Sequence, residues 1–184
     1  MPKWFYTTFL YKAWKRVLTW FGDVMFATQP PKVKAEHLRK LLFLVQRGDI
    51  LCRRYNYYLD SYFIKGKYTH SGMCISNSTM IHAIAEGVNE IDVLDFSKDT
   101  EGFVILRPDY TSPEELDKAV NFAIAQKGKP YDFIFNSHDI NYFYCHELTW
   151  DALEAGGVHI TPKEDIVYAN DIICSCKTIY ETAT

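Results

Sequence analysis

Apolar residues recur at helical spacing near the start of the chain, over residues 4–26, WFYTTFLYKAWKRVLTWFGDVMF. The stripe consists of Tyr6, Leu10, Ala13, Val17 and Phe21. This period predicts an amphipathic helix, and Gln29-Pro30-Pro31 ends it. The sequence therefore predicts an N-terminal helix and linker over residues 1–32, ahead of one main domain over residues 33–184.

Two interpretations of this first helix remain open. It packs against its own domain or a partner subunit, or it lies on an anionic lipid surface with Trp and Phe inserted. Lys12, Lys15 and Arg16 interrupt the apolar run, which argues against a signal peptide. No run of 18 apolar residues occurs, so no membrane-spanning helix is expected.

The next segments alternate between helical and strand patterns. A helix is expected over residues 34–46, followed by a turn at Gly48-Asp49 and a short apolar strand. HSGMCI and TMIHAIA then form two strands that pair as a hairpin through the Asn77-Ser78 turn, and residues 103–107 form another strand.

Helix start and stop signals mark the second half of the chain. Ser112-Pro113-Glu114-Glu115 has the form of a capping box and opens a helix to about residue 126. A helix over 145–155 is stopped by Gly156-Gly157, and a second capping-box pattern at residues 161–164 predicts a short helix near 162–169. Helices before and after a cluster of strands predict an α+β fold with a small antiparallel sheet.

Charge and cysteine content narrow the class of protein. The net charge of −3 conceals a basic start, because residues 1–40 hold eight Lys or Arg against Asp23 and Glu36. The main body is therefore acidic, which argues against a nucleic-acid binder. Five cysteines are odd in number and sparse, so we expect free thiols and a cytoplasmic location, with peripheral membrane contact through residues 4–26 as the alternative.

Cys145 is the first candidate for chemistry, because it opens the helix over 145–155. A thiol on a first helical turn lies where the helix dipole favours a thiolate. A thiol nucleophile also needs a base and a group that orients the base. His70 and His82 lie on the two strands of the predicted hairpin, and side by side they would supply both. Each of the three residues also has a purely structural interpretation, and His146 is expected at the surface.

Six short motifs occur in a characteristic order: GDIL (48–51), THSGM (69–73), MIHAIAEGV (80–88), VILRP (104–108), GKPYDFIF (128–135) and YCHEL (144–148). Together they resemble the circularly permuted NlpC-type papain-like cysteine hydrolases. This is the YiiX/YebB-like group, which is related to the lecithin:retinol acyltransferase clan. The resemblance runs from about Gly48 to about Tyr168 and implies a permuted papain-like fold, with residues 1–32 outside it.

The resemblance also implies roles for individual residues. Cys145 corresponds to the nucleophile and His70 to its base. The third catalytic residue of the family usually lies in an Ile-Glu-Ala motif, which Ile81-His82-Ala83 matches here. The orienting role therefore falls on His82, and Glu86 is a rival for that role. Tyr168 is a weak candidate for contact with the substrate. His146, where the family usually has serine, is another.

Three hypotheses of function follow from these residues. The first is an amidase or peptidase that forms an acyl-enzyme on Cys145, with a peptide as substrate. The second is an acyl hydrolase or acyltransferase that takes an acyl-lipid at a membrane surface, and the third is a catalytically inactive binding module. No metal or organic cofactor is implied, because Cys174 and Cys176 form a lone CxC pair and no ligand cluster is visible. The sequence does not predict the oligomeric state.

Overall fold

The computed structural model describes residues 8–23, 31–55, 64–135, 140–162 and 164–182. Its helices are α1 (Phe9–Asp23), α2 (Ala35–Leu44), α3 (Val93–Ser97), α4 (Pro113–Ala125), α5 (Cys145–Ala155) and α6 (Ala169–Ser175). Its strands are β1 (Ile50–Arg54), β2 (His70–Cys74), β3 (Thr79–Ile84), β4 (Gly87–Asp92), β5 (Gly102–Arg107) and β6 (Lys177–Glu181). None of the described helices is long and apolar enough to cross a membrane.

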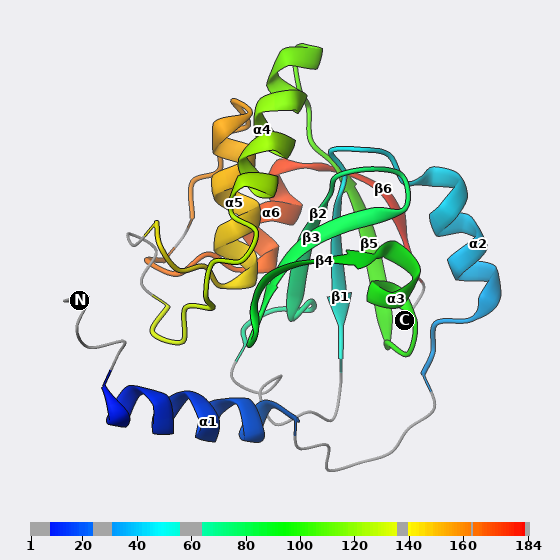
Figure 1. Ribbon diagram of the computed structural model, residues 1–184. Coiled ribbons are helices and arrows are strands. Elements are labelled where there is room, and N and C mark those ends of the chain that lie inside the picture. Colours follow the sequence, from blue (N-terminus) through cyan, green and yellow to red (C-terminus); the bar gives the residue numbers. More distant parts are fainter. Residues whose placement is uncertain (1–7, 24–30, 56–63, 136–139, 163, 183–184) are drawn as a thin grey trace.

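The six strands form one antiparallel sheet in the order β4-β3-β2-β1-β5-β6. Helices cover both faces of this sheet: α4, α5 and α6 lie on one side, and α2 and α3 on the other (Figure 1). Because successive side chains of a strand point to opposite faces, each strand contributes to both layers. The fold is therefore α+β, as the sequence predicts.

Each face of the sheet has its own hydrophobic core. On the α4–α5–α6 side, Met73 and Ile81 pack with helix residues such as Leu148. On the α2–α3 side, Met80 packs with Phe96 and with other buried residues of that layer. This division fixes which strand residues face which helices, and so it fixes the surroundings of every side chain in the central hairpin.

The hairpin of β2 and β3 forms as predicted, with Gly72 paired opposite His82. Gly72 is required here, because a Cβ atom at this position would lie 2.6 Å from the backbone oxygen of Ile81 and 3.0 Å from the Cβ of His82. The glycine of the THSGM motif thus allows the two strands to approach closely beside His82.

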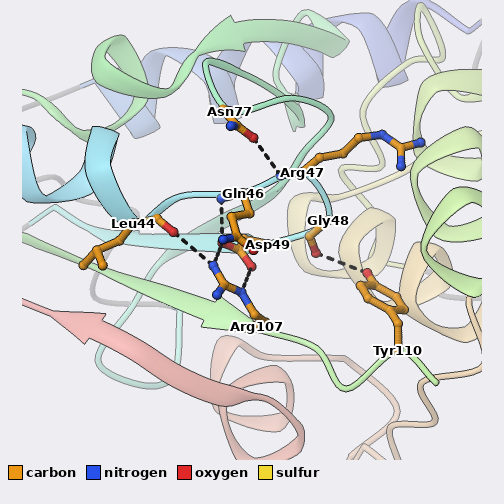
Figure 2. Close-up of polar contacts among 8 residues, drawn as sticks. All are labelled: Leu44, Gln46, Arg47, Gly48, Asp49, Asn77, Arg107 and Tyr110. Carbon is orange, nitrogen blue, oxygen red and sulfur yellow. Dashed lines mark hydrogen bonds and ion pairs between the residues drawn. The ribbon is translucent and has the colours of Figure 1, made fainter. Parts of the chain in front are cut away.

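Asp49 anchors the corner between α2 and β1 (Figure 2). Its carboxylate accepts two hydrogen bonds from the Arg107 guanidinium, both 2.8 Å long, and another of 2.8 Å from the backbone N–H of Gln46. Tyr110 donates its hydroxyl proton to the Gly48 carbonyl at 3.2 Å. The GDIL motif therefore has a structural role, since it joins the start of β1 to the end of β5.

The N-terminal helix extends over Phe9–Asp23 within the predicted range, and the remainder of residues 4–26 lies outside the described residues apart from Thr8. The short helix predicted near 162–169 is wrong. Residues 164–168 are not helical, and the exposed Glu164 forms an ion pair with Lys65 at 2.7 Å. Helix α6 instead begins at Ala169, where the Asp171 carboxylate accepts from the Tyr168 N–H at 2.9 Å. Strands β4 and β6 and helix α3 were not predicted.

Candidate active site

Helix α5 begins at Cys145, as the sequence predicts. Tyr144 is its N-cap residue, and the Glu147 carboxylate accepts the Tyr144 backbone N–H at 3.3 Å. Leu148 and Ala152 bury the helix against the sheet. These contacts hold the first turn in place, so the position of the Cys145 thiol is fixed by the packing of the whole helix.

Two opposing effects act on the Cys145 thiol. Burial is the larger effect and raises its pKa to about 11. The backbone N–H groups of Ser71, His146 and Cys145 itself, together with the charge of Arg53, act in the opposite direction. The thiol is therefore protonated at neutral pH, although the N–H groups around the sulfur favour negative charge when it develops.

His70 and His82 face the same side of the hairpin, and their rings are in contact. The Nε2 atom of His70 lies 2.9 Å from Nδ1 of His82, a hydrogen-bond distance. Phe96 from α3 stacks on the His70 ring at 5.5 Å between centroids and meets the His82 ring edge-on at 5.8 Å. The sequence suggested this pairing of the two histidines, and the stacking by Phe96 restrains both rings.

Both imidazoles are uncharged at neutral pH. Burial lowers the pKa of His70 well below its usual value of 6.5, and the nearby charges of Arg53 and His82 lower it further. Burial, followed by Arg53, lowers the pKa of His82 to about 4. One proton is then shared between Nε2 of His70 and Nδ1 of His82. If His70 is the donor, its Nδ1 atom carries a lone pair and can accept a proton.

Cys145 and His70 line the same cavity, which has a volume of about 610 Å³. It lies at the end of the sheet where β2 begins and β3 ends. Helix α5 packs on the opposite face from the imidazole pair, so the thiol reaches the cavity past the backbone of Ser71, whose N–H interacts with it. Within the described part of the chain, no hydrogen bond joins the thiol to the His70 ring.

The other predicted site residues have different positions. Glu86 lies in the turn between β3 and β4, where it is exposed at the cavity wall rather than on the strand beside His82. His82, not Glu86, therefore contacts His70. Tyr168 lines the cavity as the N-cap residue of α6 and is partly buried.

The expectation that His146 lies at the surface is wrong. Only 3% of its surface is exposed, and its Nδ1 atom lies 2.8 Å from the Ser71 hydroxyl. The hydroxyl is also 3.0 Å from that of Thr149 and 3.3 Å from the Cys145 carbonyl. His146 points toward the sheet because the first turn of α5 packs directly on β2. Burial lowers its pKa to about 4, so it is neutral.

Ser71 and Arg53 are site residues that the sequence analysis missed. Ser71 connects the strand that carries His70 to the helix that carries Cys145. Arg53 pairs with His70 across β1 and β2, and its guanidinium lies 4.3 Å from the centre of the Phe96 ring. The only available signal was position: Ser71 is next to His70, and Arg53 ends the strand of the GDIL motif.

A helix that begins at a cysteine, a histidine pair on an earlier hairpin and a cavity that His70 and Cys145 both line match the arrangement expected of papain-like thiol hydrolases in permuted order. Comparison with protein-family models shows that the chain belongs to the permuted papain-like amidase family YaeF/YiiX, C92, whose model matches residues 44–172. It therefore belongs to a family of cysteine peptidase and amidase-type enzymes, and the resemblance read from the sequence is confirmed.

Structural comparison agrees on the fold. The chain is similar to YiiX from Escherichia coli O157:H7, which is described as a metalloprotein, at 24% identity and a TM-score of 0.52. The similarity covers 61% of this chain and 67% of that chain. No curated protein matches the chain. The described residues contain no group of three or more His, Cys, Asp or Glu that could hold a metal ion.

Proposed function

We propose that the protein hydrolyses an amide bond through an acyl-enzyme on Cys145, with His70 as the base and His82 as the residue that orients it. The supporting observation is the 2.9 Å contact of His82 with His70, which lines the same cavity as the Cys145 thiol. With its Nε2 proton donated to His82, His70 presents a basic Nδ1 atom to the cavity.

The reaction begins with a neutral thiol and a neutral imidazole. As the sulfur attacks the substrate carbonyl, the thiol proton moves to Nδ1 of His70, and a tetrahedral oxyanion forms. His70 then gives this proton to the leaving amine, and the C–N bond breaks to leave a thioester. Water attacks the thioester with His70 again as base, and the acid and the free thiol are released.

The first turn of α5 provides donors for the oxyanion. The backbone N–H groups of Cys145 and His146 interact with the sulfur in the resting protein and so lie close to the reacting atoms. We assign the Cys145 N–H as one oxyanion donor. When His70 gains its proton, the bond to His82 becomes charge-assisted, which stabilises the imidazolium.

A pair of labelling experiments tests this assignment. A substrate-like acyl electrophile should modify Cys145 first, because only this thiol lies in one cavity with a histidine base. A simple alkylating agent such as iodoacetamide should instead modify Cys174 first, because Cys174 is exposed and Cys145 is buried and protonated. Acylation of all five cysteines at equal rates would contradict the proposal.

Variants provide the matched control for that experiment. Cys145→Ser and His70→Ala should abolish acylation at position 145 and turnover of peptide amides. Cys174→Ser should leave both intact, because Cys174 is exposed and is not among the described residues that line the cavity. Full acylation of Cys145 in the His70→Ala variant would show that His70 is not the base.

A second candidate function is acyl transfer or hydrolysis on a lipid substrate, by the same thioester chemistry. It is supported by the apolar walls of the cavity, which include Leu18 and Phe21 from α1 as well as Phe133 and Ile166. Mass spectrometry of the acyl-enzyme after incubation with separate peptide and lipid pools distinguishes the two. A peptide adduct supports the first function, and a fatty-acyl adduct the second.

A further inference from the structure

The outward face of α1 is strongly apolar. Half of the large hydrophobic residues that are exposed in the described structure lie on this one helix, namely Phe9, Leu10, Trp14, Val17 and Trp20. Trp20 is 69% exposed and Phe9 is 82% exposed. A soluble surface rarely gathers so many large apolar side chains in one patch, and such a patch marks an interaction site.

The arrangement of these residues around the helix is specific. At 3.6 residues per turn, Phe9, Leu10, Ala13, Val17 and Trp20 share an arc of about 100°. Trp14 adjoins this arc on one side. Tyr11 and Leu18 lie on the opposite side of the helix: Tyr11 is buried, and Leu18 lines the cavity.

Positive charge borders the arc on its other side. Lys12 and Arg16 are both exposed, and within the described part of the chain neither forms a salt bridge. Lys15 is directed inward and lies 5.6 Å from the centre of the Phe133 ring. None of the side chains described over residues 8–21 is acidic. The outward face therefore combines exposed aromatic residues with cationic residues that form no salt bridge within the described part of the chain.

We infer that α1 docks on an anionic lipid surface, with Phe9, Val17 and Trp20 inserted and with Lys12 and Arg16 at the phosphate groups. This combination is typical of helices that lie in the plane of a membrane interface. Protein interfaces share the enrichment in aromatic residues and arginine but are depleted in lysine, so Lys12 is the residue that favours lipid over protein. A second copy of this chain or another protein is thus the less favoured partner for this face of α1. The experiments below distinguish such a partner from lipid.

Docking through α1 places the cavity beside the lipid. Leu18, Thr19 and Phe21 form part of the cavity wall, and in Figure 1 the helix lies beneath the end of the sheet. The cavity that holds Cys145 would then lie at the membrane surface, where amphiphilic substrates are concentrated. The docking itself does not depend on the chemistry of Cys145.

The test uses the full chain and two kinds of vesicle, one of phosphatidylcholine and one of phosphatidylcholine mixed with phosphatidylglycerol. We expect co-sedimentation with the anionic vesicles, a blue shift of tryptophan emission, and weaker binding at high salt. The Cys145→Ser variant should bind equally well, so a failure of the proposed catalysis would leave this result unchanged. Absence of binding to anionic vesicles would overturn the inference.

Matched variants localise the surface. Replacing Trp14 and Trp20 together by Ser should abolish binding, whereas replacing the exposed Leu42 and Phe43 of α2 should not. Lys12→Gln with Arg16→Gln should weaken binding about 30-fold, because each basic residue contributes roughly a fivefold factor near an anionic surface. Circular dichroism checks that each variant is folded.

Two results would contradict these assignments. Equal loss in the α2 variant would show that binding is not specific to α1. A concentration-dependent dimer that disappears in the Trp14 and Trp20 variant, in a protein that does not bind vesicles, would assign the surface to a second copy of the chain.

Discussion

Replacing His82 by alanine tests the central feature of the site. The change removes the group at 2.9 Å from Nε2 of His70, and with it the preference for the tautomer in which Nδ1 is basic. Because His82 is 3% exposed, the change also leaves a small cavity, and we expect a loss of about 1–3 kcal/mol in the free energy of unfolding.

The magnitude of the effect on the rate follows from the charge on His70. In the resting state the bond joins two neutral rings and contributes on the order of 1 kcal/mol. In the transition state His70 carries a positive charge, and a bond to a charged group contributes roughly 1.5–3 kcal/mol. The difference between the two states, about 0.5–2 kcal/mol, is what the variant loses in the rate, so kcat/KM should fall by about 2- to 30-fold.

The assay compares kcat/KM for His82→Ala, His82→Asn and Glu86→Ala on one peptide amide, well below the melting temperature of each variant. His82→Asn should recover part of the rate, because its amide oxygen can accept the Nε2 proton. Glu86→Ala should stay within about twofold of the parent, since Glu86 is exposed in a turn. A normal rate for His82→Ala together with a large loss for Glu86→Ala would refute the assignment of the orienting role.

Three further predictions follow from described contacts. First, kcat/KM should stay constant at neutral pH and fall only well below pH 6.5, because burial and Arg53 lower the pKa of His70. For the same reason the unfolded chain binds more protons than the folded one in acid, so the melting temperature should fall as the pH drops below 6.5. An Arg53→Met variant should shift the acidic limb of the profile of kcat/KM against pH to higher pH, because the charge of Arg53 no longer lowers the pKa of His70. An unchanged profile would contradict this effect of Arg53. Second, Asp49→Ala should lower the free energy of unfolding in denaturant by about 3 kcal/mol, because it leaves Arg107 without its buried carboxylate partner. The matched control Asp117→Ala removes the exposed partner of Arg47 and should change this free energy by less than about 1 kcal/mol. Third, Gly72→Ala should lower both the melting temperature and kcat/KM, because the new Cβ atom would lie 2.6 Å from the Ile81 backbone oxygen. The expected loss in the free energy of unfolding is about 1–3 kcal/mol. An unchanged melting temperature and an unchanged kcat/KM would show that β2 and β3 can move apart without disturbing His82.

Much of the central site follows from local sequence signals. The alternation in HSGMC and TMIHAI predicts two paired strands, and pairing places His70 and His82 on one face. The extent of α5 follows from the helical pattern after Cys145 and from the glycine pair, Gly156-Gly157, that ends it. These features depend on nearby residues, so a single sequence is sufficient to find them.

The remainder depends on contacts between distant segments. His146 is buried because α5 packs on β2, which the helix pattern alone does not show. Strands β4 and β6 lie at the two edges of the sheet. They contain polar residues such as Asn89 and Lys177, so they lack the apolar pattern of a central strand. The cavity has no local signature, because its walls come from segments that are far apart in the chain.

The Cys145 thiol and the imidazole pair are supported by different hydrophobic cores, one on each face of the sheet. Helix α5 is held by the layer around Leu148, whereas His70 and His82 are backed by Phe96 in the opposite layer. Any repacking of either layer shifts one half of the site relative to the other across the sheet. If Cys145 and His70 act together as proposed, core substitutions in either layer should lower turnover as well as the melting temperature, even far from the cavity.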